Sequence, residues 1–207
     1  MASPGRANPT NSMLKLQRRH DVGFTAYHVR SGGFMVGGIQ HQDHAPAKSW
    51  VWTIGTVNLS ADGRGPAHGS GSDREEAMAM LASRWRLWLS LAGLGEIEGG
   101  APPRDPPTLS LHPREGGPSE DYAVATNGVM LGLVGRTFGV GTSRWYWTFS
   151  AVYDPERGSS RRGGGLTRDD ALAGFTEAWR AWLALAALQG AGPSPEGRIL
   201  IDDANKT

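Results

Sequence analysis

The sequence predicts an α+β fold made of two tandem ββββα repeats, with antiparallel sheets and two amphipathic helices. Three observations lead to this prediction. All eight tryptophans fall into pairs at a nearly constant offset, short alternating segments precede each pair, and one helical pattern ends each copy. Because one copy alone would leave an apolar face uncovered, we expect the copies to pack about an approximate intramolecular two-fold axis.

The repeat is clearest in its tryptophans. Residues 49–57 read SWVWTIGTV and residues 144–152 read RWYWTFSAV, at an offset of 95. The helical tryptophans follow at an offset of 94, because one residue is lost in the intervening loop. The four pairs are Trp50 with Trp145, Trp52 with Trp147, Trp85 with Trp179 and Trp88 with Trp182.

This duplication divides the chain into five parts. A Pro/Gly-rich linker, EIEGGAPPRDPP, separates the two units, and each end carries a segment outside the repeat. The expected parts are a flexible N-terminus (1–12), the first unit (13–95), the linker (96–107), the second unit (108–190) and a C-terminal tail (191–207).

Four short segments in each unit predict strands, because they alternate or are rich in β-branched and aromatic residues. The SGG and NG sequences after the second segment predict hairpin turns. Gly37 and Gly132 lie inside the third segment and indicate a bulge or a close backbone approach. The predicted strands are 13–17, 24–29, 34–41 and 49–57, then 108–112, 121–126, 129–136 and 144–152.

A helix is predicted after each set of strands. The segments 73–76 (DREE) and 167–170 (TRDD) resemble capping boxes, which satisfy free amides at a helix start. Gly95 and Gly190 are expected to stop the two helices. At 100° per residue, the apolar stripes are Ala77, Leu81, Trp85, Trp88 and Ala92, and Ala171, Phe175, Trp179, Trp182 and Ala186.

The tryptophans are expected to form core before they form a site, because each helix stripe needs an apolar sheet face to cover. Their indole N–H groups need partners, so some rings should lie near the sheet edge. The opposite face of the W-x-W strand is small and polar, with Arg144 and Tyr146 in the second copy only. That face is either a solvated surface or a shallow platform on which a flat ligand stacks.

Composition excludes some functions and leaves others open. The net charge of +1 gives no global attraction to nucleic acid or anionic membranes, so an electrostatic argument needs local clusters. The absence of cysteine excludes disulfides and thiolate chemistry. With no signal-peptide or membrane-span pattern, a cytoplasmic protein is the expectation.

Catalytic and metal-binding patterns are weak. His41 and His44 are spaced for one helix face but fall at a strand end and loop, and Arg136 replaces His41 in the second copy. All six histidines lie in residues 1–112, so no general base recurs. We therefore expect no enzyme activity, no metal and no cofactor.

The segments before the helices, 61–71 and 155–165, are basic and rich in glycine. Such segments are either solvated loops or contact phosphates diffusely, here through Arg64, Arg161 and Arg162.

A tandem ββββα unit over residues 13–190 resembles PUR-repeat and whirly-type single-strand nucleic-acid binders in topology. That resemblance implies two intertwined units with outward sheets and clasped helices. The acidic helix start after a glycine is similar to that of HicB-like antitoxins, and the W-x-W…W-x-x-W-L module is similar to small bacterial proteins.

The predicted function is non-catalytic binding of single-stranded DNA or RNA across a sheet face. The alternative is a protein-interaction module, antitoxin-like or an inhibitor, acting through a sheet edge or the aromatic face. We expect a monomer or homodimer without membrane contact. The residues expected to bind nucleic acid are Lys48, Arg64, Arg136, Arg144, Tyr146, Arg161 and Arg162.

Overall fold

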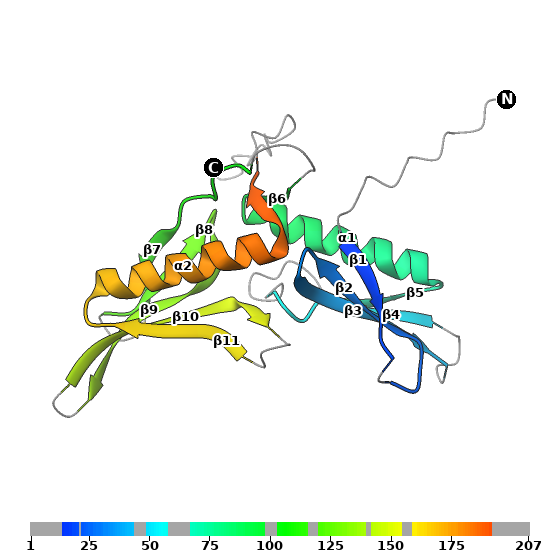
Figure 1. The fold of residues 1–207 in the computed structure, drawn as a ribbon, viewed down its shortest axis with the longest axis horizontal. Coiled ribbons are helices and arrows are strands. Elements are labelled where there is room, and N and C mark those ends of the chain that lie inside the picture. The colour runs from blue at the N-terminus through cyan, green and yellow to red at the C-terminus, as the bar shows by residue number, and fades with distance from the viewer. Residues whose placement is uncertain are drawn as a thin grey trace, which may run out of the picture.

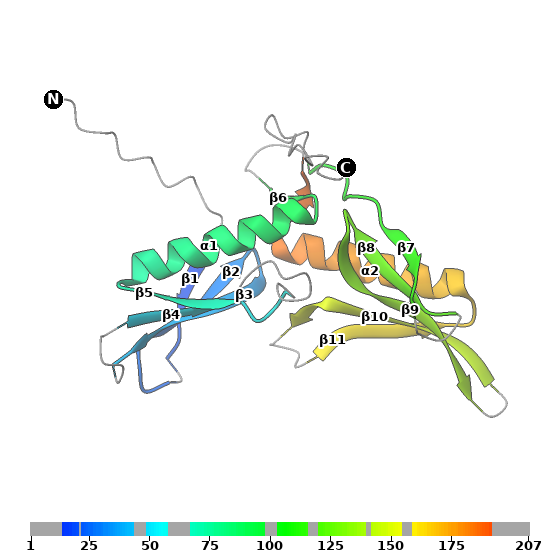
Figure 2. The same cartoon turned by 180° about the vertical axis from the view of Figure 1, so that it is seen from behind.

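The chain folds into two five-stranded antiparallel sheets, each with one helix packed on one face (Figure 1). In both views the two helices lie along the same side of the molecule, with the sheets on the other side (Figure 2). This mixed α+β class was predicted. The computed structural model describes residues 14–20, 22–43, 49–57, 67–97, 103–115, 120–139, 142–154 and 159–191.

The first sheet is a meander in which every strand pairs with the next one along the chain. Its strands are β1 (Leu14–Arg18), β2 (Ala26–Ser31), β3 (Phe34–Gln42), β4 (Ser49–Thr53) and β5 (His68–Gly71), followed by α1 (Arg74–Leu91).

The second sheet repeats this order. Its strands are β7 (Ser110–Pro113), β8 (Tyr122–Thr126), β9 (Val129–Gly139), β10 (Thr142–Asp154) and β11 (Ser159–Gly165), followed by α2 (Arg168–Ala186).

Each sheet has five strands where the sequence predicted four, because the glycine-rich segments before the helices form β5 and β11. Gly69 lies against the indole of Trp52, and a Cβ at that position would come within 2.8 Å of the ring. Gly163 lies against Trp147 in the same way, at 2.7 Å. The glycines therefore leave room for the large rings of the neighbouring strand, and the interpretation of these segments as loops was wrong for residues 68–71 and 159–165.

The predicted turns and close approaches are confirmed. Gly32, Asn127 and Gly128 have positive φ in the two hairpin turns. A Cβ on Gly37 would lie 2.0 Å from the Thr53 carbonyl oxygen, and the register of β2 and β3 shifts beside it. Gly132 has the same relation to the Thr148 carbonyl oxygen, at 1.9 Å, beside a shift between β8 and β9.

Helix α2 begins with the predicted capping box: the Thr167 hydroxyl accepts from the Asp170 N–H, and the Asp170 carboxylate accepts from the Thr167 N–H. At α1 the box is partial. Asp73 caps the Glu76 N–H, whereas the Glu76 carboxylate accepts from both the N–H and the hydroxyl of Ser72.

The predicted helix stops are wrong. Both helices end earlier, with positive φ at Gly93 and at Ala187, and the chain then enters the short strands β6 (Leu94–Glu96) and β12 (Leu188–Gly190). These two strands pair with each other, so Gly95 and Gly190 belong to a two-stranded sheet. The first residue of the predicted linker, Glu96, is therefore part of this sheet.

The apolar stripes of both helices are buried as predicted, and the residues of both sheets and both helices form one continuous core. In the W-x-W strands, Trp52 is buried while Trp50, Trp145 and Trp147 are half-buried. Among the described residues, the buried indole N–H groups with no hydrogen-bond partner are those of Trp52, Trp85, Trp88, Trp179 and Trp182. For these five rings, the expectation that the indole N–H finds a partner was wrong.

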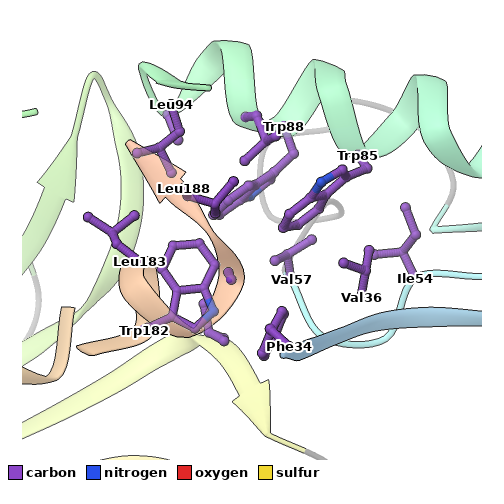
Figure 3. Packing of buried hydrophobic residues seen from close by; sticks show 14 of the residues in the cluster. Phe34, Val36, Ile54, Val57, Trp85, Trp88, Leu94, Trp182, Leu183 and Leu188 are labelled. Carbon is purple, nitrogen blue, oxygen red and sulfur yellow. The ribbon is translucent and has the colours of Figure 1, made fainter. Parts of the chain in front are cut away.

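Backbone and side-chain contacts join the two sheet–helix layers. The Ser31 hydroxyl donates to the Ala186 carbonyl oxygen at 2.8 Å, and the Thr126 hydroxyl donates to the Ala92 carbonyl oxygen at 3.3 Å. Trp182 packs beside Phe34 of the first sheet and near Trp88 of α1 (Figure 3). None of the helices in the described ranges is long and apolar enough to cross a membrane.

Candidate nucleic-acid interface

Each sheet has an open face, which we define as the face opposite its helix. Strand side chains alternate, and residues paired across strands share a face. In the first sheet Trp52, Ile39 and Tyr27 form one cross-strand row on the helix side. The next row, Thr53, Gly38 and His28, therefore lies on the open face. In the second sheet the open face carries Tyr146 beside Gly135, and the row of Arg162, Thr148, Leu133 and Ala123.

Charge is distributed unevenly between the elements. The chain as a whole has 21 Lys and Arg against 20 Asp and Glu. The ten strands of the two sheets contain a single acidic residue, Asp154, at the end of β10. The Lys and Arg residues in these strands are Lys15, Arg18, Arg30, Arg136, Arg144, Arg161 and Arg162. The sheets are thus cationic in a nearly neutral protein.

The structure brings only some of the predicted binding residues together. Arg144, Tyr146 and Arg162 share the open face of the second sheet, where both arginines are exposed. Lys48 and Arg64 lie outside the described residues.

Arg136 and Arg161 lie on the helix side, apart from that group. Arg136 pairs across from Trp145, and its Nη1 donates to both carboxylate oxygens of Glu120 at 2.9 Å. Arg161 pairs across from Phe149, and its Nη1 donates to the Ala178 carbonyl oxygen of α2 at 3.4 Å. The register therefore corrects the expectation that Arg136 adds its charge to the Arg144–Tyr146 face.

Tyr146 is held in place by its own hydrogen bonds. Its hydroxyl donates to the carboxylate of Asp121, with distances of 3.2 and 3.3 Å to the two oxygens, and Asp121 is only 5% exposed. Burial and the neighbouring Asp121 charge raise the pKa of the Tyr146 phenol. Gly135 makes room for both side chains, because a Cβ there would meet the Asp121 carboxylate and the Tyr146 ring.

The open face of the first sheet contains a hollow of about 300 Å³ that sequence reasoning missed. Its floor is formed by two adjacent glycines, Gly37 and Gly38, in the middle of β3. The signal that could have revealed it is this glycine pair inside a strand, because the second glycine leaves an open-face position empty. The residues that line the hollow around these glycines include Arg19, Ala26, His28, Met35, Gln40, Val51 and Thr53.

The candidate metal residue His41 has a local partner. Its Nδ1 lies 2.9 Å from the Asp43 carboxylate, and its ring packs against Trp50 with centroids 5.1 Å apart. The described part of the chain contains no cluster of three or more His, Cys, Asp or Glu residues that could hold a metal ion. His44 lies outside that part.

The open faces combine groups that bind phosphate with groups that recognise flat rings. Guanidinium and ammonium groups pair with phosphate oxygens, while amide, hydroxyl and aromatic groups contact bases. Compared with protein-family models, with curated proteins and with solved structures, the chain matches none of them.

Proposed function

We propose that this protein binds single-stranded nucleic acid, without catalysis, across the open faces of its two sheets. The observation that carries the proposal is the separation of charge, with cations on the strands and nearly all acids elsewhere. A strand of nucleic acid needs a cationic surface that follows its backbone and flat or hollow places for its bases. The open-face cations are Lys15 and Arg30 on the first sheet and Arg144 and Arg162 on the second.

The remaining predicted residues take different parts in this proposal. Tyr146 offers a ring for stacking at the place where its hydroxyl bond to Asp121 holds it. Arg161 adds to the positive potential of the sheets from the helix side, whereas the charge of Arg136 is compensated by Glu120. Lys48 and Arg64 remain candidates from the sequence alone.

We also infer that the chain is an internal duplication folded about an approximate two-fold axis. Contacts between equivalent residues support this inference, because a residue meets its own counterpart only at such an axis. Trp88 meets Trp182, Val57 bridges to Val152, and β6 pairs with β12. Away from the axis the contacts are reciprocal: Ser31 bonds to Ala186, and its counterpart Thr126 bonds to Ala92. Two related faces would allow one strand to bind both sheets.

Fluorescence anisotropy with short labelled DNA and RNA oligomers tests the proposed function. Affinity should fall as salt rises, because neutralised phosphates release counterions. Replacing both Arg144 and Arg162 by Ala should weaken binding and reduce the log–log salt slope by about 1.4, at ~0.7 per phosphate contact on a single strand.

The matched control is Arg180→Ala, which removes an exposed cation from α2, on the opposite side from the open faces. It should leave the slope unchanged. Absence of binding at low micromolar protein and modest salt, or equal effects of the sheet and helix substitutions, would reject single-strand binding.

A second candidate function is protein interaction through a sheet edge. Leu16 on the edge strand β1 is 39% exposed, and Leu111 on the edge strand β7 is 37% exposed. Edge strands carry unpaired backbone groups that another chain can pair with. The aromatic face is a poorer candidate because Trp52 of β4, Trp85 of α1 and Trp179 of α2 are buried in the core. A pull-down from lysate with and without nuclease separates the two functions, since only a direct protein partner survives nuclease treatment.

A further inference from the structure

We propose that the hollow on the open face of the first sheet is a pocket for one nucleobase. The base comes either from a bound strand or from a free nucleotide, and both present the same flat ring with a hydrogen-bonding edge. Where the base belongs to a bound strand, the proposal rests on the single-strand binding proposed above and deepens it. It assigns recognition of the hydrogen-bonding edge of a base to the first sheet, and leaves stacking to Tyr146 and backbone contact to both sheets.

The size and shape of the hollow suit a single ring system. Ligand pockets span roughly 300–1,000 Å³, so the hollow of about 300 Å³ lies at the lower end of this range. The floor is bare backbone at Gly37 and Gly38, and the side chains of Met35 and Val51 add apolar lining. The faces of a base are apolar, so transferring them from water to a flat surface beside aliphatic side chains costs little free energy.

The polar lining matches the edge of a base. Gln40 contributes an amide that both donates and accepts, and Thr53 contributes a hydroxyl. Neither side chain hydrogen-bonds to another residue in the described ranges. His28 and Arg19 complete the lining, and Arg19 places a cation at the hollow for a phosphate.

The second sheet shows what fills such a hollow. At the positions 95 residues further along, Gly38 is replaced by Leu133, Val51 by Tyr146 and Ala26 by Asp121. Tyr146 and Asp121 hydrogen-bond over Gly135, which is the counterpart of Gln40. The space that is open in the first sheet is thus occupied in the second, and the polar edge of Gln40 is lost. This difference between the sheets supplies the test variants.

Gly38→Leu fills the hollow with the side chain that the second sheet carries there. A Cβ at Gly38 would contact only the Tyr27 carbonyl oxygen, at 3.2 Å, so the backbone can accept it after a small shift. Val51→Tyr fills the same space from the neighbouring strand and serves if Gly38→Leu does not fold, as judged by circular dichroism. Both variants leave every Lys and Arg in place.

The experiment compares a labelled oligomer with an abasic oligomer of equal length, and titrates a free nucleoside monophosphate by calorimetry. We expect Gly38→Leu to weaken binding of the base-containing strand by roughly five- to a hundredfold. Binding of the abasic strand should not change, because it depends on phosphates alone.

Each outcome decides between the proposals. If the oligomer binds equally well to the wild type and to the filled variants, the pocket is rejected while single-strand binding stands. If no oligomer binds but the free nucleotide does, and Gly38→Leu abolishes this, the pocket stands and strand binding is rejected. If neither ligand binds the wild type, both proposals are rejected.

Discussion

The indole rings of Trp88 and Trp182 meet edge to face, with their centroids 5.9 Å apart and their planes at 90°. One ring belongs to α1 and the other to α2, and they are 3% and 1% exposed. Edge-to-face aromatic pairs are favourable beyond the area they bury. The two sheet–helix layers therefore share one core, and damage to either ring should be felt by both.

Truncating one of these rings should destabilise the whole chain. We expect Trp182→Ala to lower the free energy of unfolding by about 3–5 kcal/mol, since it leaves a cavity where a buried aromatic stood. Chemical denaturation measures this, with Leu166→Ala as control because Leu166 is 79% exposed. A loss below about 0.5 kcal/mol would mean that the ring is not buried.

The two hydrogen bonds between the sheet–helix layers should contribute independently to the free energy of unfolding. Ser31→Ala and Thr126→Ala each leave a buried carbonyl, that of Ala186 or of Ala92, without its donor. Each substitution should lower stability by about 1–3 kcal/mol, and the double variant should show their sum. Thermal and chemical denaturation check this against Ser90→Ala on the exposed surface of α1. A neutral Ser31→Ala would argue against the contact between the layers.

The glycines of β5 and β11 should not tolerate a methyl group. A Cβ on Gly163 would come within 2.7 Å of the Trp147 indole, so Gly163→Ala should lower the free energy of unfolding by about 1–3 kcal/mol. Gly23→Ala is the matched control, because a Cβ there meets nothing within 4 Å. Equal stability of the two variants in urea would show that β11 does not lie against the ring.

The Tyr146 phenol should titrate above the ordinary tyrosine value of 10.0, because burial and the Asp121 charge raise its pKa. A pKa that is higher in the folded state means that the protonated phenol stabilises the folded protein. This contribution to the free energy of unfolding is complete below pH 10 and is lost as pH rises through the folded pKa. Asp121→Asn should lower the Tyr146 pKa, since it removes the negative charge. Ultraviolet absorbance titration measures the change, and Tyr146→Phe identifies the signal. An unchanged titration in Asp121→Asn would contradict the assigned cause.

Much of the fold could be predicted because tryptophans are large and few. Their pairing fixed the correspondence between the two sheets, and residue alternation around them identified the buried face of β4 and β10. The helix stripes followed from the 3.6-residue period. These signals are local, and each depends on side chains that must be buried somewhere.

The sites could not be predicted equally well, because they depend on pairing between strands. Alternation shows which residues of β9 share a face. It does not show which face of β9 lies on the same side of the sheet as the Tyr146 face of β10. Only the register between β9 and β10, which places Arg136 opposite Trp145 and Tyr146 opposite Gly135, separates Arg136 from Tyr146, and that register could not be read from the sequence. Gly69 and Gly163 looked like loop residues, because the indole ring that requires a glycine at each position belongs to another strand.

The pairing of β6 with β12 constrains the order in which this protein can fold during its synthesis. Strand β6 and Trp88 are made early, but their partners β12 and Trp182 emerge roughly ninety residues later. At a synthesis rate of about 5–20 residues per second, this delay lasts roughly 5–20 seconds. During that interval the nascent first sheet and helix carry an unpaired strand and an uncovered indole, which are features that molecular chaperones recognise. A chain that stalls or terminates in this interval would be a substrate for quality control.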